Sequence, residues 1–325
     1  MVFRMTCLLA AASLSVCGTA QAQNPAASYP TKPVRIVVGY QAGGPTDVVA
    51  RLLASRLQAQ TGQPFIVENK AGAGSNLASE VVASSAPDGY TLLLAAAPIT
   101  MASFVYKGLK WDVQGSFEPI SMVMSAPAIL AVAPHLPAKN VQELVALAKK
   151  KPGELTFGST GNGGTHHVAG EMFKQRAGID LIHVPYKGAA GAIQDVMAGH
   201  VSLSLMTSVS AVPFIKDNKV RALAVAAPKR LPQLPNVPTM AEAGMPGFEV
   251  DSWNGLLAPK GTSPAIVEKL HAEVVKALAD AEMRAKLIDQ GAIVVGSSPA
   301  DFKAHIRKEV DHWAKLFPTI NVKID

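Results

Sequence analysis

Short apolar runs alternate with helical segments along most of this chain, and this rhythm constrains the fold more than any other feature. In the helical segments apolar residues recur every three or four positions, whereas the runs between them are short and rich in branched residues. Such an order of strand, helix and strand predicts a parallel sheet with helices on both faces. The expected strands are Val34–Val38, Phe65–Asn69, Thr91–Ala95, Ala128–Ala133, Leu155–Ser159, Leu181–Val184, Val201–Met206 and Val220–Ala226. The expected helices are Thr46–Gln60, Ser75–Ser85, Val141–Lys150, Thr165–Ala177, Ala189–Gly199, Ser210–Asp217, a short one near Thr239–Ala243, Ser263–Leu278, Ala281–Gln290 and Pro299–Leu316.

The rhythm restarts after the third strand, which suggests a second domain of similar construction. The last three helices are expected to cover the sheet of the first domain, so the chain would cross between domains near Met124 and again near Trp253. We therefore assign residues 23–124 and 253–325 to domain 1, and residues 125–252 to domain 2. Two crossing strands between α/β lobes make a hinge, and ligands favour the cleft between such lobes.

The first residues have the pattern of a secretory signal peptide. Arg4 supplies a positive charge, Met5–Val16 is apolar, and Ala20-Gln21-Ala22 is an A-x-A cleavage site. The apolar run is too short to span a bilayer. We therefore expect residues 1–22 to be removed on export. Cys17 leaves a lipoprotein alternative open, although the bulky valine before it fits lipoprotein processing poorly.

Cysteine usage and charge narrow the range of functions. Both cysteines, Cys7 and Cys17, lie in the expected leader, so the mature chain would contain neither a disulfide nor a reactive thiol. The full chain has a net charge of +6, spread along its length rather than gathered into a basic stripe with interleaved aromatics. This distribution argues against nucleic-acid binding. A mild positive field favours small acidic ligands.

Two glycine-rich turns each follow a predicted strand and open a predicted helix. We call Gly39–Asp47 the first turn and Ser159–Thr165 the second turn. Glycines let the backbone approach a ligand closely, and we expect free N–H groups around Gly43–Gly44 and at the helix start to attract an anion. Tight turns also serve as plain connections in α/β proteins. One turn in each half, at the carboxyl end of a strand, nevertheless favours a shared binding site.

Asp47 in the first turn has three possible roles. Its carboxylate suits the positive end of the helix dipole, and with Thr46 it can cap free N–H groups. In direct contact with an anionic ligand it would be repulsive. Alternatively, it can orient water molecules that touch the ligand. The capping role is the simplest of the three.

Motifs for catalysis are missing from the sequence. Gly72–Leu77 lacks the third glycine of a dinucleotide fingerprint, and Gly158–Gly161 is not a nucleophile elbow. His167 and Glu171 are spaced for a shared metal ion, but no third ligand has suitable spacing. We therefore expect no catalytic residue, no metal and no cofactor.

Several motifs, in the expected order, resemble the substrate-binding proteins of tripartite tricarboxylate transporters, the Bug or TctC-like family of periplasmic receptors. The resemblance covers essentially the whole mature chain. Its motifs are YPTKPVRIVV, AGGPTD, QPFIVENKAGAGSNLASEVVASSAPDGYTLL, GSTGNGGTHHVAGEMF, HVPYKGAAGAIQDVMAGHVSL, VRALAV with LPNVPTMAEAG, and SWNGLLAPKGT.

The resemblance implies an α/β, two-lobed periplasmic-binding-protein fold of the Venus-flytrap kind, with two parallel-rich sheets flanked by helices and a ligand cleft between the lobes. It implies a monomeric periplasmic receptor that binds a small organic carboxylate and delivers it to a permease of one large and one small subunit. Gly43, Gly44 and Asp47 would position waters on one carboxylate, and the second turn would contact the ligand through hydroxyls and N–H groups. The candidate ligand-binding residues are Tyr40, Gln41, Ala42, Gly43, Gly44, Thr46, Asp47, Ser159, Thr160, Asn162, Gly163, Gly164, Thr165 and Thr207.

Three departures from the family pattern lie near the presumed pocket, so the ligand is not inherited from any relative. Tyr40-Gln41-Ala42 replaces a common Phe-Pro-Pro or Phe-Ala-Ala run, Ala97–Thr100 replaces a stretch that often has Ser/Thr-His, and Met206-Thr207 replaces an Asp-Asn pair. Two alternatives stay open beside the transport receptor. One is a sensor of the same fold that presents its ligand to a membrane kinase, and the other is a periplasmic enzyme that acts on a carboxylate.

Overall fold

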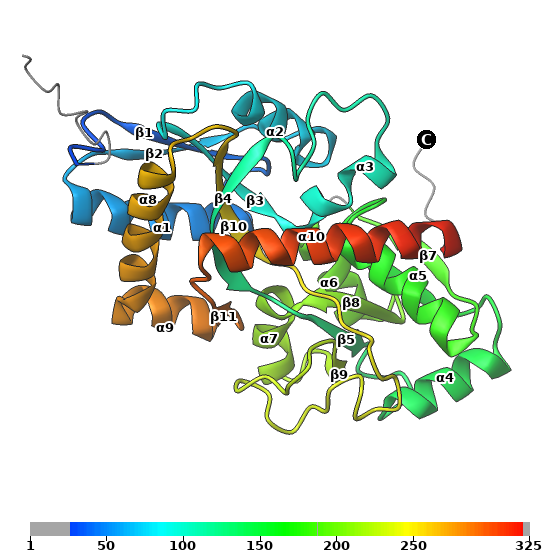
Figure 1. Ribbon diagram of the computed structural model, residues 1–325. Helices are drawn as coiled ribbons and strands as arrows, with labels where there is room; N and C mark the ends of the chain where they lie inside the picture. Colours follow the sequence, from blue (N-terminus) through cyan, green and yellow to red (C-terminus); the bar gives the residue numbers. More distant parts are fainter. Residues whose placement is uncertain (1–26, 187, 321–325) are drawn as a thin grey trace, which may run out of the picture.

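Two helix-covered sheets form two lobes in the computed structural model, which describes residues 27–186 and 188–320 (Figure 1). The first lobe is built on the sheet β11-β4-β10-β3-β1-β2 and the second on the sheet β7-β6-β8-β5-β9. The strands of the first lobe are β1 (Val34–Val38), β2 (Phe65–Asn69), β3 (Thr91–Ala96), β4 (Phe117–Ser125), β10 (Asn254–Pro259) and β11 (Ile293–Val294). Those of the second lobe are β5 (Ala128–Val132), β6 (Thr156–Ser159), β7 (Ile182–Pro185), β8 (Leu203–Thr207) and β9 (Arg221–Val225). The predicted two-lobed α/β fold is confirmed, while the predicted leader lies outside the described residues.

Helices cover both sheets. The helices of the first lobe are α1 (Pro45–Thr61), α2 (Asn76–Ala83), α3 (Ala102–Val105), α8 (Pro264–Ala279), α9 (Ala281–Asp289) and α10 (Pro299–Leu316), with short 3-10 segments η1 (Ala73–Ser75), η2 (Ala97–Thr100) and η3 (Phe317–Thr319). Those of the second lobe are α4 (Val141–Lys150), α5 (Thr165–Ala177), α6 (Ala189–Ala198) and α7 (Ser208–Lys216). Over the described part of the chain, no helix has both the length and the apolarity needed to cross a membrane.

The sheets are mixed, so the expected parallel pairing extends over only part of each one. In the first lobe β1 runs parallel to β2 and β3, whereas β10 is antiparallel to β3 and β4. In the second lobe β6 runs parallel to β7 and β8, whereas β5 is antiparallel to β8 and β9. Apart from the two-residue edge strand β11, which is antiparallel to β4, the antiparallel strands are β5 and β10, which the chain forms on entering a lobe from the other lobe. Their direction is therefore set by the crossing and not by a strand–helix–strand unit.

The central strands of each sheet are buried on both faces, which is why they are almost continuously apolar. Ile36 of β1 packs into one core of the first lobe and its neighbour Val37 into the core on the opposite face. In the second lobe Leu130 and Ile129 of β5 divide in the same way between two cores. Adjacent side chains of a strand point to opposite faces, so a strand covered on both sides needs apolar residues at every position.

Several segments differ from the sequence prediction, and α3, β10 and β11 are among those that it did not include. β4 was not predicted, because Pro119 and Glu118 interrupt its apolar run and proline usually argues against a central strand. The expected helix near Thr239–Ala243 is wrong, because the chain there makes only a single turn. Gly244, with a φ of 84°, follows in a left-handed conformation that ends the turn.

The chain crosses between the lobes in two extended segments that pair with each other. Asp251 accepts hydrogen bonds from the Ser125 hydroxyl at 2.7 Å and from the backbone N–H of Ala126 at 2.9 Å. The N–H of Ala128 donates to the carbonyl of Val250 at 2.8 Å. Burial raises the pKa of Asp251, although the Ser125 hydrogen bond counteracts this effect. The strand memberships support our proposal that the domains divide near these segments.

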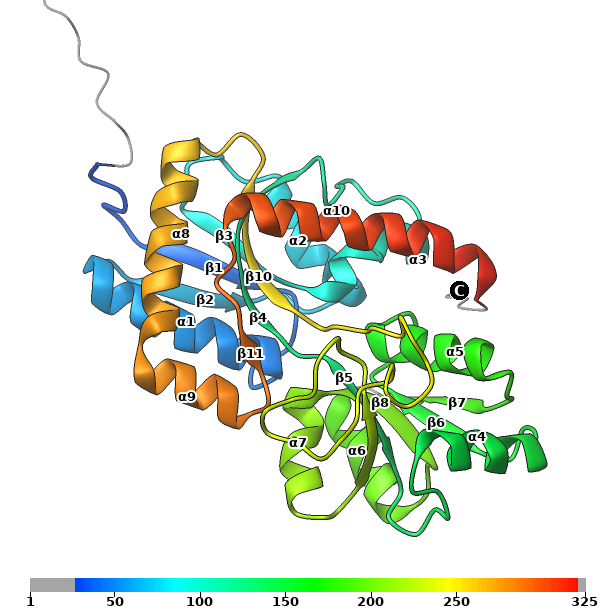
Figure 2. The ribbon, with the colours of Figure 1, turned by 60° about the horizontal axis from the view of Figure 1, so that its bottom comes forward.

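Helix α10 lies along the first lobe, and its C-terminal end reaches α5 of the second lobe (Figure 2), where the Gln175 side-chain amide donates to the carbonyl of Thr319 at 3.1 Å. Phe302 and Ile306, near its beginning, are buried in a core of the first lobe. Trp313 lies about three helical turns after Phe302 and is buried in a core formed mainly by the second lobe. The Trp313 indole N–H also donates to the Thr100 hydroxyl at 3.0 Å. The C-terminal helix is therefore a third connection between the lobes, in addition to the two crossing segments.

We predict that Trp313→Ala lowers the free energy of unfolding by about 3–5 kcal/mol, because it leaves a large cavity between the lobes. Urea denaturation followed by circular dichroism measures this change. Lys308→Ala, an exposed change on the same helix, is the matched control and should stay within about 0.5 kcal/mol of the wild type. Equal free energies of unfolding of the Trp313 and Lys308 variants would show that the packing of Trp313 against the second lobe does not stabilise the fold.

Candidate functional site

The first turn connects β1 to α1 and leaves the beginning of the helix uncapped by any side chain. Gly44 is the N-cap residue with φ −74° and ψ 166°, and Pro45 occupies the first helical position. Proline has no N–H group and is pre-organised for this position. The backbone N–H groups of Thr46 and Asp47 follow it and have no acceptor within the helix. They are therefore the donors that this turn offers to an anion.

Asp47 is buried and holds the first turn from behind. Its carboxylate accepts hydrogen bonds from the Gly43 N–H, the Arg51 guanidinium and the Asn69 side-chain amide, each at 2.8 Å. Burial alone would raise the pKa of Asp47, but the hydrogen bonds from Arg51, Gly43 and Asn69 outweigh it and lower the pKa to about 2. The Asn69 amide also donates to the carbonyl of Tyr40 at 3.0 Å. Asp47 thus ties together the two ends of the turn.

The network around Asp47 corrects one expectation from the sequence. The N–H groups of Gly43 and Gly44 are not free, because they donate to Asp47 at 2.8 Å and to the carbonyl of Gln41 at 3.3 Å. Gly43 has a φ of 80°, a left-handed conformation in which glycine is favoured. The glycines therefore shape the turn, and the free N–H donors are those of Thr46 and Asp47 at the beginning of α1.

The remaining candidate residues of the first turn lie at its edge. Gln41 and Ala42 are exposed, and Tyr40 is partly buried against the core of the first lobe. Burial raises the pKa of Tyr40 above its usual range, so its phenol is neutral. The buried hydroxyl of Thr46 accepts a hydrogen bond from the Asn254 side-chain amide at 3.2 Å.

Asn254 is a polar residue of this site that the sequence did not reveal. It begins β10, is 4% exposed, and also approaches the carbonyl of Ala95 at 3.3 Å. Its only signal in the sequence is an amide at the start of an otherwise apolar run, next to the expected crossing at Trp253. Through its hydrogen bond to Thr46, Asn254 connects the end of the second crossing segment to the first turn.

The second turn repeats the local geometry of the first. Gly164 is the N-cap of α5 with φ −80° and ψ 168°, almost the same angles as Gly44, and again no side chain caps the helix. Thr165 opens the helix, and its hydroxyl is buried without a hydrogen-bond partner among the described residues. Buried polar groups normally have partners, so an unpartnered hydroxyl at a helix N-terminus indicates a binding position.

Other atoms of the second turn are used internally. The Ser159 hydroxyl lies 2.7 Å from Nε2 of His183 and also bonds with the backbone of Gly161. The Gly163 N–H donates to Nδ1 of His167 at 3.0 Å. Asn162 is exposed at the tip of the turn, beside the partly buried Thr160. Imidazoles support this turn in the way that a carboxylate supports the first.

The structure brings Thr207 to the beginning of α5. Its backbone N–H donates to Nε2 of His166 at 3.2 Å, and its hydroxyl lies 3.0 Å from that of Ser210. Because Nε2 of His166 accepts a hydrogen bond, the proton of the neutral ring is on Nδ1. That Nδ1 is buried and has no partner within the described residues. Thr165 and His166 therefore place two unpartnered polar atoms side by side in the sequence.

Alternative kinds of site have little support. Within residues 27–186 and 188–320, no cluster of three His, Cys, Asp or Glu side chains is placed to hold a metal ion. Ser159 and His183 have the spacing of a nucleophile and its base, but Ser159 has 0% exposure and its hydroxyl bonds to its own turn. Neither metal chemistry nor acyl transfer is indicated by this arrangement.

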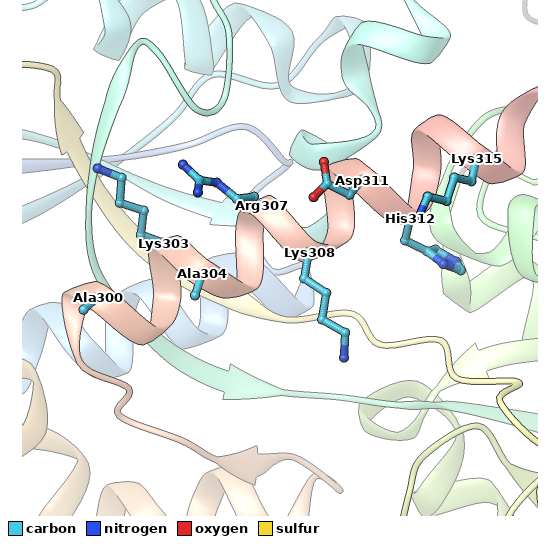
Figure 3. Close-up of a pocket in the computed structure, with 8 residues that line it drawn as sticks. All are labelled: Ala300, Lys303, Ala304, Arg307, Lys308, Asp311, His312 and Lys315. Atoms are coloured by element: carbon cyan, nitrogen blue, oxygen red, sulfur yellow. The ribbon is translucent and has the colours of Figure 1, made fainter.

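A basic hollow of about 650 Å³ lies on the outer face of α10 (Figure 3). None of the candidate ligand-binding residues lines it. Its lining comes from one helix and consists of Ala300, Lys303, Ala304, Arg307, Lys308, Asp311, His312 and Lys315. Because the charged residues on one exposed helical face do not converge on a common point, we place the candidate site at the two turns.

Solved structures show the class of protein that this fold represents. The structure of R. palustris Rpa4515 with adipate matches with a TM-score of 0.82 and 36% identity, over 90% of this chain and 98% of that one. MatC (Rpa3494) from Rhodopseudomonas palustris with bound malate matches with a TM-score of 0.78 and 33% identity, over 89% of this chain and 100% of that one. The two-lobed fold and these likenesses define a periplasmic solute-binding receptor.

The family follows from the sequence match. Residues 49–322 match the family described as tripartite tricarboxylate transporter family receptor, and the chain belongs to this family. Protein BugT of Bordetella pertussis is 34% identical over 299 residues, which cover 91% of this chain and 92% of that protein. The predicted resemblance is confirmed, and so is the prediction of a receptor rather than an enzyme, since the family consists of receptors.

We predict that stability falls as the pH is lowered from about 6.5 towards 4. Burial lowers the pKa of both His166 and His167 to about 4. Between pH 6.5 and 4 these imidazoles are therefore protonated in the unfolded chain but remain largely neutral in the folded chain. Each group then removes up to about 1.4 kcal/mol per pH unit, and the loss levels off below the folded pKa. Urea denaturation at several pH values measures the slope.

A matched pair of variants assigns this slope to the site. His166→Gln keeps an acceptor for the Thr207 N–H but does not titrate, so the slope should become shallower. Asn162→Gln changes an exposed side chain at the tip of the second turn and adds or removes no titratable group, so it should leave the slope unchanged. An unchanged slope in the His166 variant would show that this buried imidazole does not carry the pH dependence.

Proposed function

We propose that the chain is a periplasmic receptor that holds a small organic carboxylate between the first and second turns. The observation that carries this proposal is the pair of glycine-capped helix N-termini, one in each lobe, with nearly identical cap angles at Gly44 and Gly164. Each leaves backbone N–H groups free at the positive end of a helix dipole, which is a suitable place for an anion. The unpartnered Thr165 hydroxyl adds a polar group at one of them.

Carboxylate binding here does not need a free cationic side chain. Arg51 lies near the first turn, but its guanidinium is bound to Asp47 at 2.8 Å and to Asn69 at 3.2 Å. The Arg51–Asp47 pair also compensates the negative charge that would otherwise repel an incoming anion. We infer that the ligand is held by the N–H groups of Thr46 and Asp47 in one lobe and of Thr165 and His166 in the other.

The candidate residues divide into two groups under this proposal. Residues at the helix beginnings contact the ligand directly or through water, and residues behind them fix the shape of the turns. The first group contains Thr46, Thr165 and Thr207, together with Tyr40, Gln41, Ala42, Thr160 and Asn162 at the edges. The second group contains Gly43, Gly44, Asp47, Ser159, Gly163 and Gly164.

The relatives support the ligand class and the transport role. One solved relative is a structure with adipate and another is a structure with bound malate, and both ligands are small carboxylates. Membership of the family supports delivery of the ligand to a tripartite transporter. We propose in addition that the permease has one large and one small subunit, that the receptor is a monomer, and that residues 1–22 are cleaved on export to the periplasm.

A thermal-shift panel tests the proposed function. We expect at least one acid among adipate, malate, succinate, citrate, benzoate and glutamate to raise the melting temperature, because a ligand that binds only the folded state stabilises it. At a hundredfold excess over Kd the stabilisation is about 2.7 kcal/mol. The protein is first unfolded and refolded to remove any ligand carried through purification. A flat response across the panel would count against carboxylate binding.

We predict that Gly44→Val and Gly164→Val each weaken binding of the responding acid by more than about 2 kcal/mol, or roughly thirtyfold. Both glycines have extended angles that valine adopts readily, and the nearest atoms to an added Cβ lie at 3.3 Å and 3.7 Å. At Gly164 the branched side chain would therefore cover the helix N-terminus without moving the backbone, whereas at Gly44 the carbonyl of Gln41 has to shift by a few tenths of an ångström. Isothermal titration calorimetry measures the loss.

Gly115→Val is the control for this pair. An added Cβ there meets the Asp112 carboxylate at 3.3 Å, in a loop of the first lobe remote in sequence from both turns. Its affinity for the acid should equal that of the wild type. Gly163 is unsuitable for the same test, because its φ of 70° would make valine costly to the fold itself. Wild-type affinity in both N-cap variants, with folding confirmed by circular dichroism, would exclude the two turns as the binding site.

A further inference from the structure

A stack of three aromatic rings lies behind the second turn. The imidazoles of His167 and His183 are almost parallel, with 3.8 Å between ring centroids and 7° between planes. The ring of Phe157 continues the stack at 4.8 Å from His183. The three residues come from α5, β7 and β6, so three elements meet in this stack.

Each imidazole bonds to a different end of the turn. His183 contacts the Ser159 hydroxyl at 2.7 Å, where the turn leaves β6. His167 accepts the Gly163 N–H at 3.0 Å, just before the N-cap of α5. Gly163 is held there with a φ of 70°. The stack therefore spans the turn and fixes both of its ends.

We propose that His167 and His183 are positioning residues for the ligand: as a stacked pair they hold Ser159 and Gly163, and thereby fix the direction in which the N-terminus of α5 is presented. This inference rests on the proposed function, because it assumes that the second turn meets the ligand. It goes further by naming two residues that act through the turn and do not themselves need to touch the ligand.

The arrangement requires neutral imidazoles of defined tautomer. Nδ1 of His167 accepts the Gly163 N–H, so the proton of the ring is on Nε2. The charged groups near the stack are Lys174, whose ammonium lies 6.0 Å from the Phe157 ring, and Glu171, which pairs with Lys174 at 3.1 Å. Burial first, and then the Lys174 charge, lowers the pKa of His183 as well, which keeps the pair uncharged at neutral pH.

Paired substitutions separate the hydrogen bonds from the stacking. His167→Asn keeps an acceptor close to the position of Nδ1 but loses the ring, whereas His167→Phe keeps a ring and loses the acceptor. In the same way, His183→Gln keeps a polar group near Nε2 and His183→Phe keeps only the ring. If the hydrogen bonds position the turn, each amide variant should outperform its phenylalanine partner.

The first readout needs no ligand. Hydrogen exchange followed by NMR reports how well the Gly163 amide is protected, and long-range nitrogen–proton spectra report the tautomer of His167. We expect the Nε2–H tautomer in the wild type. We expect Gly163 exchange to be about tenfold faster in His167→Phe, the effect of one lost hydrogen bond, and to return to within about threefold of the wild type in His167→Asn.

The second readout is the affinity for adipate and malate, measured by calorimetry. We expect both phenylalanine variants to bind about tenfold more weakly than the wild type, and both amide variants to recover most of this loss. Equal affinities in the amide and phenylalanine variants, or unchanged protection of Gly163 in His167→Phe, would overturn the positioning role and leave only packing. If the wild type binds neither acid, the proposed function fails for these ligands, while the exchange experiment still decides whether the imidazoles hold the turn.

Discussion

A glycine-rich turn has no bulky side chains with which to hold its own shape, and in each lobe a side chain from the following helix holds the turn by accepting a hydrogen bond from one of its glycines. In the first lobe the support is ionic: Asp47 accepts the Gly43 N–H and is neutralised by Arg51. In the second lobe the support is neutral, since His167 accepts the Gly163 N–H at a comparable distance. In each case the acceptor is the third residue of the helix that follows, four residues after the glycine.

The two kinds of support have different electrostatic consequences. A buried carboxylate beside an anion site is acceptable only if its charge is cancelled, and the guanidinium of Arg51 does this at 2.8 Å. Imidazoles that stay neutral bring no charge to cancel and no attraction of their own. The helix N-termini are then the source of positive potential that the two turns themselves supply. Under the proposed function, such a site would recognise an anion by the direction of its dipoles, which depends on the turns keeping their shape.

The sequence predicted the elements that are defined by local signals. The bounds of α4, α5 and α10 follow from residues at their own ends, such as Asn140, which caps α4, and Ser298, which caps α10. The glycine turns were recognised for the same reason. The hydrogen bonds of the site could not be predicted in this way, because they join residues far apart in the sequence. Ser159 pairs with His183, and Thr46 pairs with Asn254. Periodicity carries no information about such hydrogen-bond partners, and so the sequence analysis assigned free donors to the glycines as well as to the helix start.

The position of α10 limits how the lobes can move. Two bodies joined only by a pair of adjacent strands can bend and twist about that pair with several degrees of freedom. A third attachment away from the strands, here Trp313 in the second lobe with Phe302 in the first, removes most of them. We therefore expect any relative movement of the lobes that keeps this attachment to be a rotation about a line through the strand pair and the indole. Opening and closing would then follow one path in opposite directions.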